Sequence, residues 1–443
     1  MSPADLDALY REHAADLERR TAAVLAAQGW DALVVHSGSL VKRSQFDDQF
    51  WPLRPCPHFA HWLPLVEPDC AVIVRAGAKP KLVRTVVPSF WEAPPEPESR
   101  AFIEALEVTE ARGDVAGMAG GGRVAFVGED ASRAAFWGIP ADRACPPLLV
   151  RALDALRTTK TPYELACIAE ANRRARAGHV ALRDAFGAGE ASELDLHLLF
   201  LGATAQDDWE TPYKNIVAVG SHAATLHHVA YGRHAGPREA QSLLVDAGAT
   251  CRGYGSDVTR TWTKGTGAAA SAFAQLVAGV EAMQQRLCAA VRVGMPYEDL
   301  HDESHRQLAG VLREVGLVRE GSSEAAAVVT RVFFPHGLGH SLGLQTHDVG
   351  CGLRMPRADN PFLRNTSDVT AGQVFTIEPG VYFIPSLLAE LRAKPEGQMV
   401  DWRLVEALAP LGGVRIEDDV FVGEDAVRNV TREQLPVGGG IVG

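Results

Sequence analysis

The chain has 443 residues, of which 47% are apolar and 22% are charged. These proportions are typical of a globular protein with a sizeable core, and they exclude a disordered chain, a collagen and a coiled coil. Asp and Glu (55) outnumber Lys and Arg (43), which gives a formal net charge of −12. An acidic chain without a block of basic residues is a poor candidate for binding nucleic acid or an anionic membrane.

The sequence predicts a cytoplasmic protein with reduced thiols. No apolar run approaches the roughly 18 residues that span a bilayer, and the first residues are acidic and lack an apolar signal segment. The seven cysteines are odd in number, and no two of them form a Cys-x-x-Cys pair, which argues against a disulfide framework or a zinc finger. They are Cys56, Cys70, Cys145, Cys167, Cys251, Cys288 and Cys351.

A mixed α/β domain is expected over residues 1–156. Apolar residues between Leu6 and Leu25 recur on one helical face. Gly120–Gly122 precede a strand and open no helix, so we interpret them as a loop rather than a phosphate-binding motif. Strand-sized apolar runs are found at Ala32–Val35, Ala71–Val74, Lys81–Val86 and Val124–Val127.

A second domain, residues 157–443, is expected to open with a capped helix. Thr161 is a good N-cap, Pro162 suits the first helical position and Glu164 completes a capping box, while the polar residues 157–160 are interpreted as a linker. We expect helices near residues 162–186, 191–206, 268–292 and 298–315. The expected strands are Asn215–Val219, Ser242–Asp246, Asp257–Thr263, Val374–Glu378 and Val414–Val420.

Four carboxylates stand at or inside these strands. Asp246 ends an apolar run and Asp257 begins the next strand, and the small residues between them predict a hairpin that sets the two aspartates side by side. Glu378 follows another apolar run, and Glu417 lies inside the last strand. A carboxylate at a buried position must be paired or bound to a metal ion.

A histidine motif accompanies the carboxylates. His340 closes the segment His-Gly-Leu-Gly-His that begins at His336, and His347 follows seven residues later. Four carboxylates and one imidazole are mostly hard donors, a set that suits two divalent ions such as Mn²⁺, with Co²⁺, Zn²⁺ or Fe²⁺ as alternatives, better than a structural zinc. Two such ions can activate water and polarise a carbonyl.

Each of these residues has a more ordinary explanation when it is taken singly. An Asp at a strand end is usually a turn or capping residue. Glu-Pro-Gly is usually a turn, and His-Gly-x-Gly-His could be a loop with one hydrogen-bonded histidine. The occurrence of all of them in this order favours a metal site.

The motif series resembles that of the pita-bread metallopeptidases, which include methionine aminopeptidase, aminopeptidase P and Xaa-Pro dipeptidase (prolidase). It is most similar to the bacterial prolidases and the organophosphorus acid anhydrolases, over nearly the whole chain. The resemblance implies an α/β (α+β) fold with a creatinase-like N-terminal mixed α/β domain before a pita-bread catalytic domain. Its motifs are Asp246-Ala247-Gly248, Asp257-Val258-Thr259-Arg260-Thr261, His336-Gly337-Leu338-Gly339-His340, Glu378-Pro379-Gly380 and Arg415-Ile416-Glu417-Asp418.

The resemblance implies a role for each metal ligand. Asp246 and Asp257 would bind one ion, with Asp257 bridging to the second. His340 and Glu378 would complete the second ion, and Glu417 would bridge. Glu378 would also take the proton from the attacking water.

It also implies residues that act beside the ions. His347 would hydrogen-bond the oxyanion or the departing proline nitrogen, Arg415 would brace the site and His336 would line the pocket. Arg364 would bind the C-terminal carboxylate of the substrate, because a guanidinium fork matches a carboxylate. The alternative for Arg364 is an ordinary surface position.

One stretch departs from the family pattern. The family usually has Leu-His-Tyr where this chain has Leu-His-His-Val-Ala-Tyr. We take His227 as the histidine that faces the substrate, while His228 or Tyr231 could take its place, and all three could belong to an ordinary loop. The pocket wall is expected to include Tyr213, Tyr297 and Leu363.

The resemblance further implies a homodimer. In relatives the N-terminal domain of one chain reaches the active site of the other, and residues 46–51 resemble the segment that does so. Asp47 and Asp48 in this segment could meet the free amine of the substrate, or the segment could be a solvated loop.

The predicted function is metal-dependent hydrolysis of Xaa-Pro dipeptides with a C-terminal proline, with slow hydrolysis of phosphotriesters or fluoridates as a side activity. The alternatives are an aminopeptidase P that accepts longer peptides and a metal-free pita-bread module that only binds peptides. The presence of all five ligands argues against the binding module, since such a module has no need of them.

Overall fold

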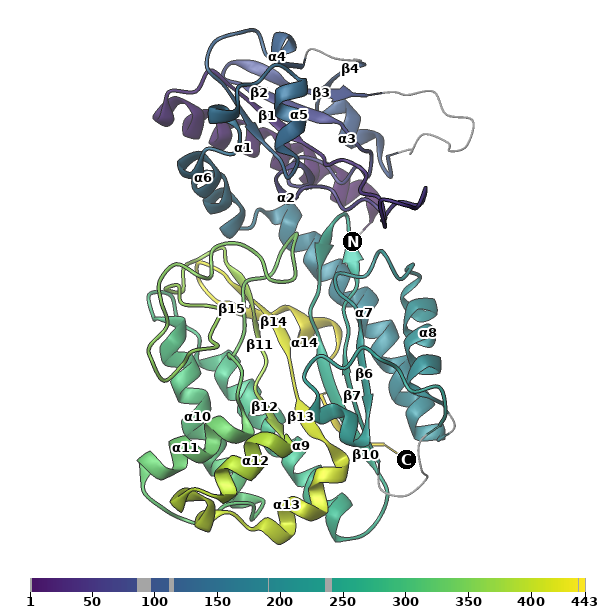
Figure 1. The fold of residues 1–443 in the computed structure, drawn as a ribbon, viewed down its shortest axis with the longest axis vertical. Coiled ribbons are helices and arrows are strands. Elements are labelled where there is room, and N and C mark those ends of the chain that lie inside the picture. The colour runs from purple at the N-terminus through teal and green to yellow at the C-terminus, as the bar shows by residue number, and fades with distance from the viewer. Residues whose placement is uncertain are drawn as a thin grey trace. The chain divides into compact units, whose positions relative to one another are not determined.

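The computed structural model describes residues 2–85, 97–110, 115–189, 191–235, 241–436 and 438–442. The chain divides into two compact units, Met1–Ala166 and Cys167–Gly443 (Figure 1). Across the described ranges, every helix is too short or too polar to cross a membrane.

The N-terminal unit is built on a five-stranded mixed sheet with the order β4-β3-β2-β1-β5. The four strands expected from apolar runs are present, although the last residue of the predicted run 81–86 lies outside the described residues. Strand β4 was not predicted, because Glu-Val-Thr-Glu is an exposed edge strand without an apolar run. The strands are β1 (Ala32–His36), β2 (Ala71–Arg75), β3 (Ala78–Arg84), β4 (Glu107–Glu110) and β5 (Val124–Val127).

Helices complete this unit, and one of them corrects the predicted linker. Arg157 and Thr158 form the last residues of α6, and Arg157 is buried together with Leu149 and Leu153 at intervals of four residues. A polar residue on the apolar face of a helix hid the helix end from the sequence pattern. The helices are α1 (Pro3–Gln28), α2 (Pro57–Ala60), α3 (Arg100–Glu104), α4 (Val115–Met118), α5 (Ala131–Phe136) and α6 (Pro147–Thr158).

The predicted capping box opens α7 (Pro162–Ala188). The backbone N–H of Thr161 donates to the Glu164 carboxylate at 2.7 Å, and the Glu164 N–H lies 3.4 Å from the Thr161 hydroxyl oxygen. Helix α8 (Glu193–Thr204) follows. Apolar residues of α7 and α8 share a core with β6, β7 and β10, so these helices cover one side of that sheet.

The C-terminal unit holds a sheet of order β16-β10-β7-β6, a sheet of order β11-β14-β15 and the pair β12-β13. The predicted hairpin is present: β7 and β10 are antiparallel, with Asp246 opposite Thr259. The strands are β6 (Ile216–Val219), β7 (Gln241–Asp246), β10 (Thr259–Lys264), β11 (Val374–Ile377), β12 (Gly380–Tyr382), β13 (Gly413–Arg415), β14 (Asp418–Val422), β15 (Val427–Asn429) and β16 (Gly440–Ile441), with the short pair β8 (Thr250–Cys251) and β9 (Tyr254–Gly255) in the hairpin connection.

The single strand predicted at residues 414–420 is two strands, β13 and β14. The break falls at Ile416 and Glu417, and Glu417 instead forms an isolated antiparallel bridge with Thr259 of β10. The break therefore brings Glu417 beside the hairpin that carries the two aspartates.

A second group of helices covers the other face of the unit (Figure 1). Apolar residues of α9, α10 and α11 share one large core with β11 and β14. Helices α9 and α10 match the predicted helices 268–292 and 298–315 to within a few residues, whereas α11 and the later helices were not predicted. The group comprises α9 (Ala268–Ala290), α10 (Tyr297–Glu314), α11 (Ser323–Phe333), α12 (Pro385–Arg392) and α13 (Trp402–Leu408). The short helix α14 (Val430–Gln434) lies apart from this core, and its Thr431 hydroxyl donates to Asn172 of α7 at 2.7 Å.

Candidate metal centre and substrate pocket

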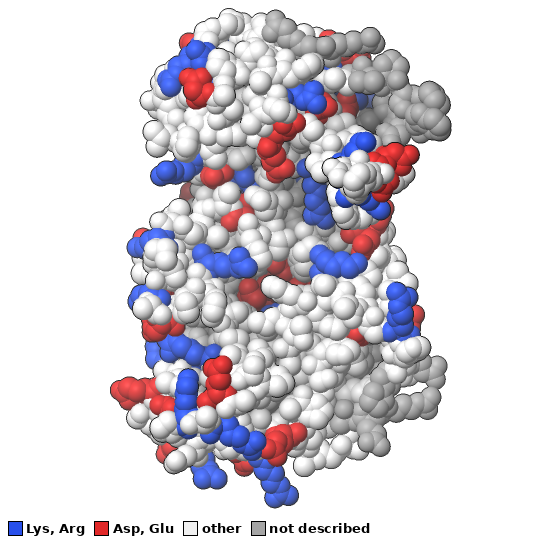
Figure 2. All heavy atoms as spheres, viewed as in Figure 1, with Lys and Arg blue, Asp and Glu red and all other residues white. Residues whose placement is uncertain are grey.

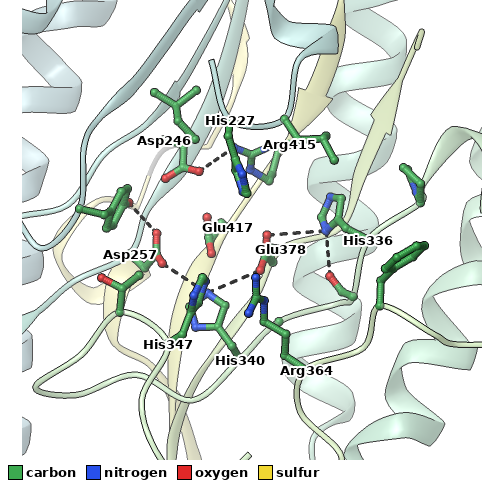
Figure 3. Close-up of a pocket in the computed structure, with 18 of the residues that line it drawn as sticks. His227, Asp246, Asp257, His336, His340, His347, Arg364, Glu378, Arg415 and Glu417 are labelled. Atoms are coloured by element: carbon green, nitrogen blue, oxygen red, sulfur yellow. Dashed lines mark hydrogen bonds and ion pairs between the residues drawn. The ribbon is translucent and has the colours of Figure 1, made fainter. Parts of the chain in front are cut away.

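The C-terminal unit contains a cavity of about 870 Å³ that the five predicted metal ligands line. Figure 2 shows acidic atoms inside a hollow of the surface with basic side chains on either side. In Figure 3 the five side chains converge on a common space. We refer to these residues together as the carboxylate centre: Asp246, Asp257, His340, Glu378 and Glu417.

The β7–β10 hairpin places the aspartates. Asp246 is the last residue of β7, and Asp257 lies two residues before β10. The backbone N–H of Asp257 points at the Asp419 carboxylate, 3.2 and 3.3 Å from its two oxygens. Asp257 is therefore held by its backbone, which leaves its own carboxylate directed into the cavity.

The strand break places Glu417. Its backbone N–H donates to the Thr259 carbonyl at 3.1 Å, and the Thr259 hydroxyl donates to Glu417 Oε2 at 2.6 Å. One strand residue thus holds Glu417 by both its main chain and its side chain.

The histidine segment runs alongside β11. The Glu378 N–H donates to the Leu338 carbonyl at 2.8 Å, and the Thr376 N–H donates to the His340 carbonyl at 2.9 Å. A Cβ on Gly339 would lie 2.1 Å from the Thr376 carbonyl oxygen, so glycine is required for this close approach. The packing brings His340 opposite Glu378.

The separations within the carboxylate centre are those of ligands around an ion. His340 Nε2 lies 3.4 Å from Asp257 Oδ2 and 3.7 Å from Glu378 Oε1. Atoms that bind one ion at roughly 2.1 Å lie about 3 to 4 Å apart. Asp257, His340 and Glu417 offer ligand atoms that all lie within 4.8 Å of one another.

The electrostatics of the centre also favour a cation. Burial and the neighbouring Asp257 charge raise the pKa of Glu417 well above its usual range, and burial raises the pKa of Glu378 to about 7. Asp246 has a raised pKa for the same reasons, and its buried Oδ1 accepts no hydrogen bond from the described residues. Burial alone would lower the pKa of His340, but the Asp257 carboxylate outweighs it and raises that pKa to about 9. This excess of buried negative charge fits divalent metal ions.

Arg415 supplies the nearest fixed positive charge. Its Nη2 donates to Asp246 Oδ2 at 2.6 Å, its Nη1 donates to the Tyr382 hydroxyl at 3.0 Å and its Nε donates to the Thr259 hydroxyl at 3.2 Å. Arg415 is buried, and one guanidinium cannot balance four carboxylates. These contacts fix Arg415 beside the carboxylate centre, and its bracing role stays a prediction.

His336 lines the cavity as predicted and is held in one tautomer. Its Nδ1–H donates to the Gly337 carbonyl at 2.8 Å, so its Nε2 accepts the proton of the Tyr382 hydroxyl at 2.7 Å. Burial lowers its pKa to about 3. Its Nδ1 lies 3.8 Å from Glu378 Oε2, which places a neutral imidazole beside that carboxylate.

His347 and His227 also line the cavity. The His347 ring lies 4.4 Å from the His340 ring in an edge-to-face arrangement, and burial together with the nearby His340 lowers the His347 pKa to about 4. Figure 3 shows His227 on the side of Asp246 and Arg415, with His347 on the side of His340.

Three predicted substrate residues lie on the cavity wall, namely Tyr213, Leu363 and Arg364. The Tyr213 hydroxyl donates to Asp257 Oδ1 at 2.5 Å, so Tyr213 contacts a predicted ligand directly. Tyr297 was wrongly assigned to this wall. It is fully buried beneath Gly339, and its hydroxyl donates to the Thr376 carbonyl at 2.7 Å.

The two alternatives to His227 are also wrong. The His228 side chain turns away from the cavity, and its Nε2 lies 2.9 Å from Glu193 Oε2. The Tyr231 ring stacks on His197 at 4.5 Å, and its hydroxyl donates to the Asn215 carbonyl at 2.5 Å. The contacts of His228 and Tyr231 therefore stabilise the loop itself, and neither side chain lines the cavity.

Asp47 and Asp48 belong to the N-terminal unit. They lie in a segment whose aromatic residues are exposed, with Phe46 at 90% and Trp51 at 48%. Their proposed contact with a substrate in a partner subunit stays a prediction.

Sequence reasoning missed several residues of the cavity. Thr259 contacts Glu417, and the Tyr382 hydroxyl contacts both His336 and Arg415. Thr259 could have been found from the sequence, because it is a polar residue inside a strand that is otherwise expected to be buried. A single apolar residue carries no comparable signal, whether it lies in a strand, a helix or a loop. The missed lining residues of this kind are Ile216, Leu226, Val229, Ile384 and Leu387.

Two protein families match the chain. The family described as "Metallopeptidase family M24" matches residues 166–424. The family described as "Xaa-Pro dipeptidase, N-terminal domain" matches residues 8–154. Together they span both compact units.

Similar proteins agree with these matches. The Xaa-Pro dipeptidase of Pseudoalteromonas atlantica is 38% identical over 439 residues, which covers 96% of this chain and 98% of that protein. The Xaa-Pro dipeptidase of Marinobacter nauticus is 40% identical over 433 residues, which covers 97% and 99%.

Solved structures share the fold. Aminopeptidase P from Escherichia coli in its low-pH form has a TM-score of 0.72 and 21% identity, covering 97% of this chain and 96% of that one. Pseudomonas aeruginosa aminopeptidase PepP has a TM-score of 0.72 and 20% identity, covering 96% and 95%. The predicted architecture, with a mixed α/β N-terminal part before a pita-bread part, is confirmed. With relatives about 40% identical over nearly its full length, the chain belongs to metallopeptidase family M24, among its Xaa-Pro dipeptidases.

Proposed function

We propose that this enzyme hydrolyses dipeptides with a C-terminal proline by means of two divalent ions, with Mn²⁺ the best fit to the donor set. The observation that carries the proposal is one cavity that holds the carboxylate centre and, on its wall, Arg364. In this scheme Asp246 and Asp257 would hold one ion, His340 and Glu378 would hold the other, and Asp257 and Glu417 would be shared between them.

The ions, when bound, would supply Lewis-acid chemistry. In this scheme Glu378 would also accept a proton from water and return it to the departing proline nitrogen. His347 and His227 lie on opposite sides of the centre (Figure 3). In the same scheme His347 would hydrogen-bond the oxyanion or the departing proline nitrogen, and His227 would face the substrate. Neutral His336 beside Glu378 adds no charge that would compete with this proton transfer.

We propose that Arg364 binds the free C-terminal carboxylate of the substrate. Its guanidinium forms no ion pair with any described residue, although it lines a cavity rich in carboxylates. An Arg that keeps its fork free at a cavity wall can bind an incoming carboxylate through two hydrogen bonds. A dipeptidase needs such a group, because it must reject a chain that continues beyond proline.

The test compares an Xaa-Pro dipeptide with its C-terminal amide. A charge-assisted bidentate pair could contribute about 2–4 kcal/mol, or very roughly 30- to 1,000-fold in kcat/KM. Arg364→Ala should lose this preference and Arg364→Lys should restore only part of it, since an ammonium forms no fork. The matched control is Arg354→Ala, an exposed Arg that pairs with Asp368 outside the cavity.

The wild-type result separates the two peptidase alternatives. Equal kcat/KM for the dipeptide and for its amide or a tripeptide would contradict the dipeptidase assignment and make the enzyme an aminopeptidase P. Undiminished turnover by a demonstrably metal-free preparation would contradict the metal-dependent mechanism.

We further propose a cytoplasmic homodimer in which residues 1–156 mediate dimerisation and active-site access for the catalytic part, residues 157–443. Seven free cysteines support a reducing compartment. Asp47 and Asp48 would meet the substrate amine in the partner subunit. A fully active monomer in analytical sedimentation would contradict this arrangement.

Slow hydrolysis of phosphotriesters or fluoridates is the proposed side activity. Tetrahedral phosphorus resembles the tetrahedral intermediate of peptide hydrolysis, and Tyr213 and Leu363 on the cavity wall would shape its fit. Hydrolysis no faster than that by the free metal ions would rule this activity out.

A further inference from the structure

A second buried carboxylate in the C-terminal unit lies beside the segment that carries His227. Glu193 is the first residue of α8, after the N-cap Ser192, and only 4% of its side chain is exposed. Asp195 completes the capping box with Ser192. Glu193 therefore has no capping duty and points instead at residues 219–232.

Four N–H groups surround the Glu193 carboxylate. Oε1 accepts from the Val219 backbone at 2.8 Å and from His222 Nδ1 at 2.7 Å. Oε2 accepts from the Gly232 backbone at 2.6 Å and from His228 Nε2 at 2.9 Å. The two backbone donors stand at the two ends of the segment, so one side chain closes the segment into a loop.

The four donors keep Glu193 ionised. Burial alone would raise its pKa, but the N–H groups of Gly232 and Val219, followed by His228 and His222, outweigh burial and lower it. The His222 and His228 rings also stack on each other at 4.4 Å with an angle of 26° between their planes. We refer to Glu193, His222 and His228 as the clamp.

The clamp differs from a metal site in its distances. Ligands that share an ion lie about 3 to 4 Å apart, whereas the Glu193–His222 and Glu193–His228 separations of 2.7 and 2.9 Å are hydrogen bonds. Each carboxylate oxygen already accepts a backbone N–H in addition. The Glu193 carboxylate is therefore hydrogen-bonded to residues of the loop, and the three side chains are not arranged around an ion.

The loop between the two clamped ends lines the cavity. Leu226, His227 and Val229 are lining residues, and His227 lies next to Asp246 and Arg415 in Figure 3. His228 points to Glu193 while His227, its neighbour, faces the cavity. His228 is thus held on the Glu193 side of the loop, while His227 lies on its cavity side.

We infer that Glu193 is a positioning residue, which holds residues 219–232 through the clamp so that His227 faces the carboxylate centre. The part of this inference that concerns turnover rests on the proposed function. The part that concerns the loop does not depend on it.

Hydrogen exchange tests the loop directly. Glu193→Gln keeps the size of the side chain but turns one acceptor into an NH₂ group, which faces N–H donors. Amide exchange in residues 219–232 should accelerate at least about tenfold, and His228→Phe, which removes one donor and keeps a ring for stacking, should give a smaller acceleration. The matched control is Asp195→Asn, which weakens the hydrogen bonds that the Asp195 carboxylate accepts from Ser192 in the same helix turn and leaves the loop untouched. Unchanged protection of the amides of residues 219–232 in Glu193→Gln would contradict the proposal that Glu193 holds this loop.

Kinetics test whether the clamp acts through His227. Glu193→Gln and His227→Ala should each lower kcat/KM about tenfold or more on an Xaa-Pro dipeptide, and the double variant should be no worse than His227→Ala alone. Asp195→Asn should combine with His227→Ala multiplicatively. Multiplying effects of Glu193→Gln and His227→Ala would contradict positioning through His227. An inactive wild-type enzyme would contradict the proposed function, and the exchange experiment would still decide on the clamp.

Discussion

Two buried groups of acids and histidines in the C-terminal unit behave in opposite ways. In the clamp, four N–H groups fill the lone pairs of a single carboxylate and lower its pKa. In the carboxylate centre, four carboxylates share one guanidinium, and burial raises the pKa of Glu417 and Glu378. The comparison teaches that the supply of donors, rather than burial, decides whether a buried carboxylate holds the fold or recruits a cation.

The largest expected effect follows from removing a ligand that both ions would share. Loss of a residue that only supports a ligand typically lowers activity 10- to 100-fold, so Asp257→Asn should lower kcat by more than about 100-fold. Glu193→Gln, in the clamp, should lower it much less. Steady-state kinetics in excess Mn²⁺ measures both. Equal losses in the two variants would break the distinction between the two groups.

The free energy of unfolding of an Arg415 variant would sharpen this comparison. Arg415→Met leaves the buried Asp246 carboxylate without its 2.6 Å partner, and breaking a buried pair in this way costs about 3–5 kcal/mol in unfolding free energy. The control is Arg428→Met, whose pair with Glu433 is 46% and 38% exposed and is worth less than about 1 kcal/mol. Urea unfolding of the metal-free protein measures both. A loss for Arg415→Met as small as that for Arg428→Met would contradict the burial argument.

The stability of the metal-free protein should also depend on pH, and we expect this effect to be smaller than the two above. Glu378 has a pKa raised from 4.5 to about 7, so the unfolded chain loses this proton first and stability falls as pH rises between these values. The pKa of His340, raised from 6.5 to about 9, adds stability that is complete below 6.5 and is lost as pH rises to about 9. Buried histidines with lowered pKa, such as His336 and His347, add stability as pH rises to about 6.5 and no more above it. The thermal midpoint of the chelated protein should therefore fall from about pH 7 to pH 9.

Metal ions should reverse this trend, because they bind the deprotonated ligands. The gain in thermal midpoint that Mn²⁺ gives over the chelated protein should grow from pH 5 through neutral pH, as the ligands lose their protons. A chelated protein that becomes more stable toward pH 9 would contradict the raised pKa values.

Much of the site could be predicted because its signals are local. Asp246 and Asp257 flank a connection of small residues that only a hairpin explains, and Thr161 with Glu164 marks a helix start within four residues. The break at Glu417 could not be predicted, since an apolar run does not show where a strand leaves its sheet. Its position depends on a bridge to Thr259, a residue distant in the sequence.

The direction in which a single side chain points could not be predicted either. Tyr297, His228 and Tyr231 have the residue types of a pocket wall, yet each is used to hold the fold. Glu193 follows a Ser at a helix start, so from the sequence it is indistinguishable from an ordinary capping acid. Only the folded arrangement of its four donors shows what it does.

Metal content per chain tests the central claim most directly. Wild type, Asp257→Asn and Glu193→Gln would be loaded with Mn²⁺, dialysed and measured by elemental analysis. We predict two ions per chain in wild type and in Glu193→Gln, and fewer in Asp257→Asn. Two ions retained by Asp257→Asn, or an ion lost from Glu193→Gln, would contradict the assignment of the ions to the carboxylate centre.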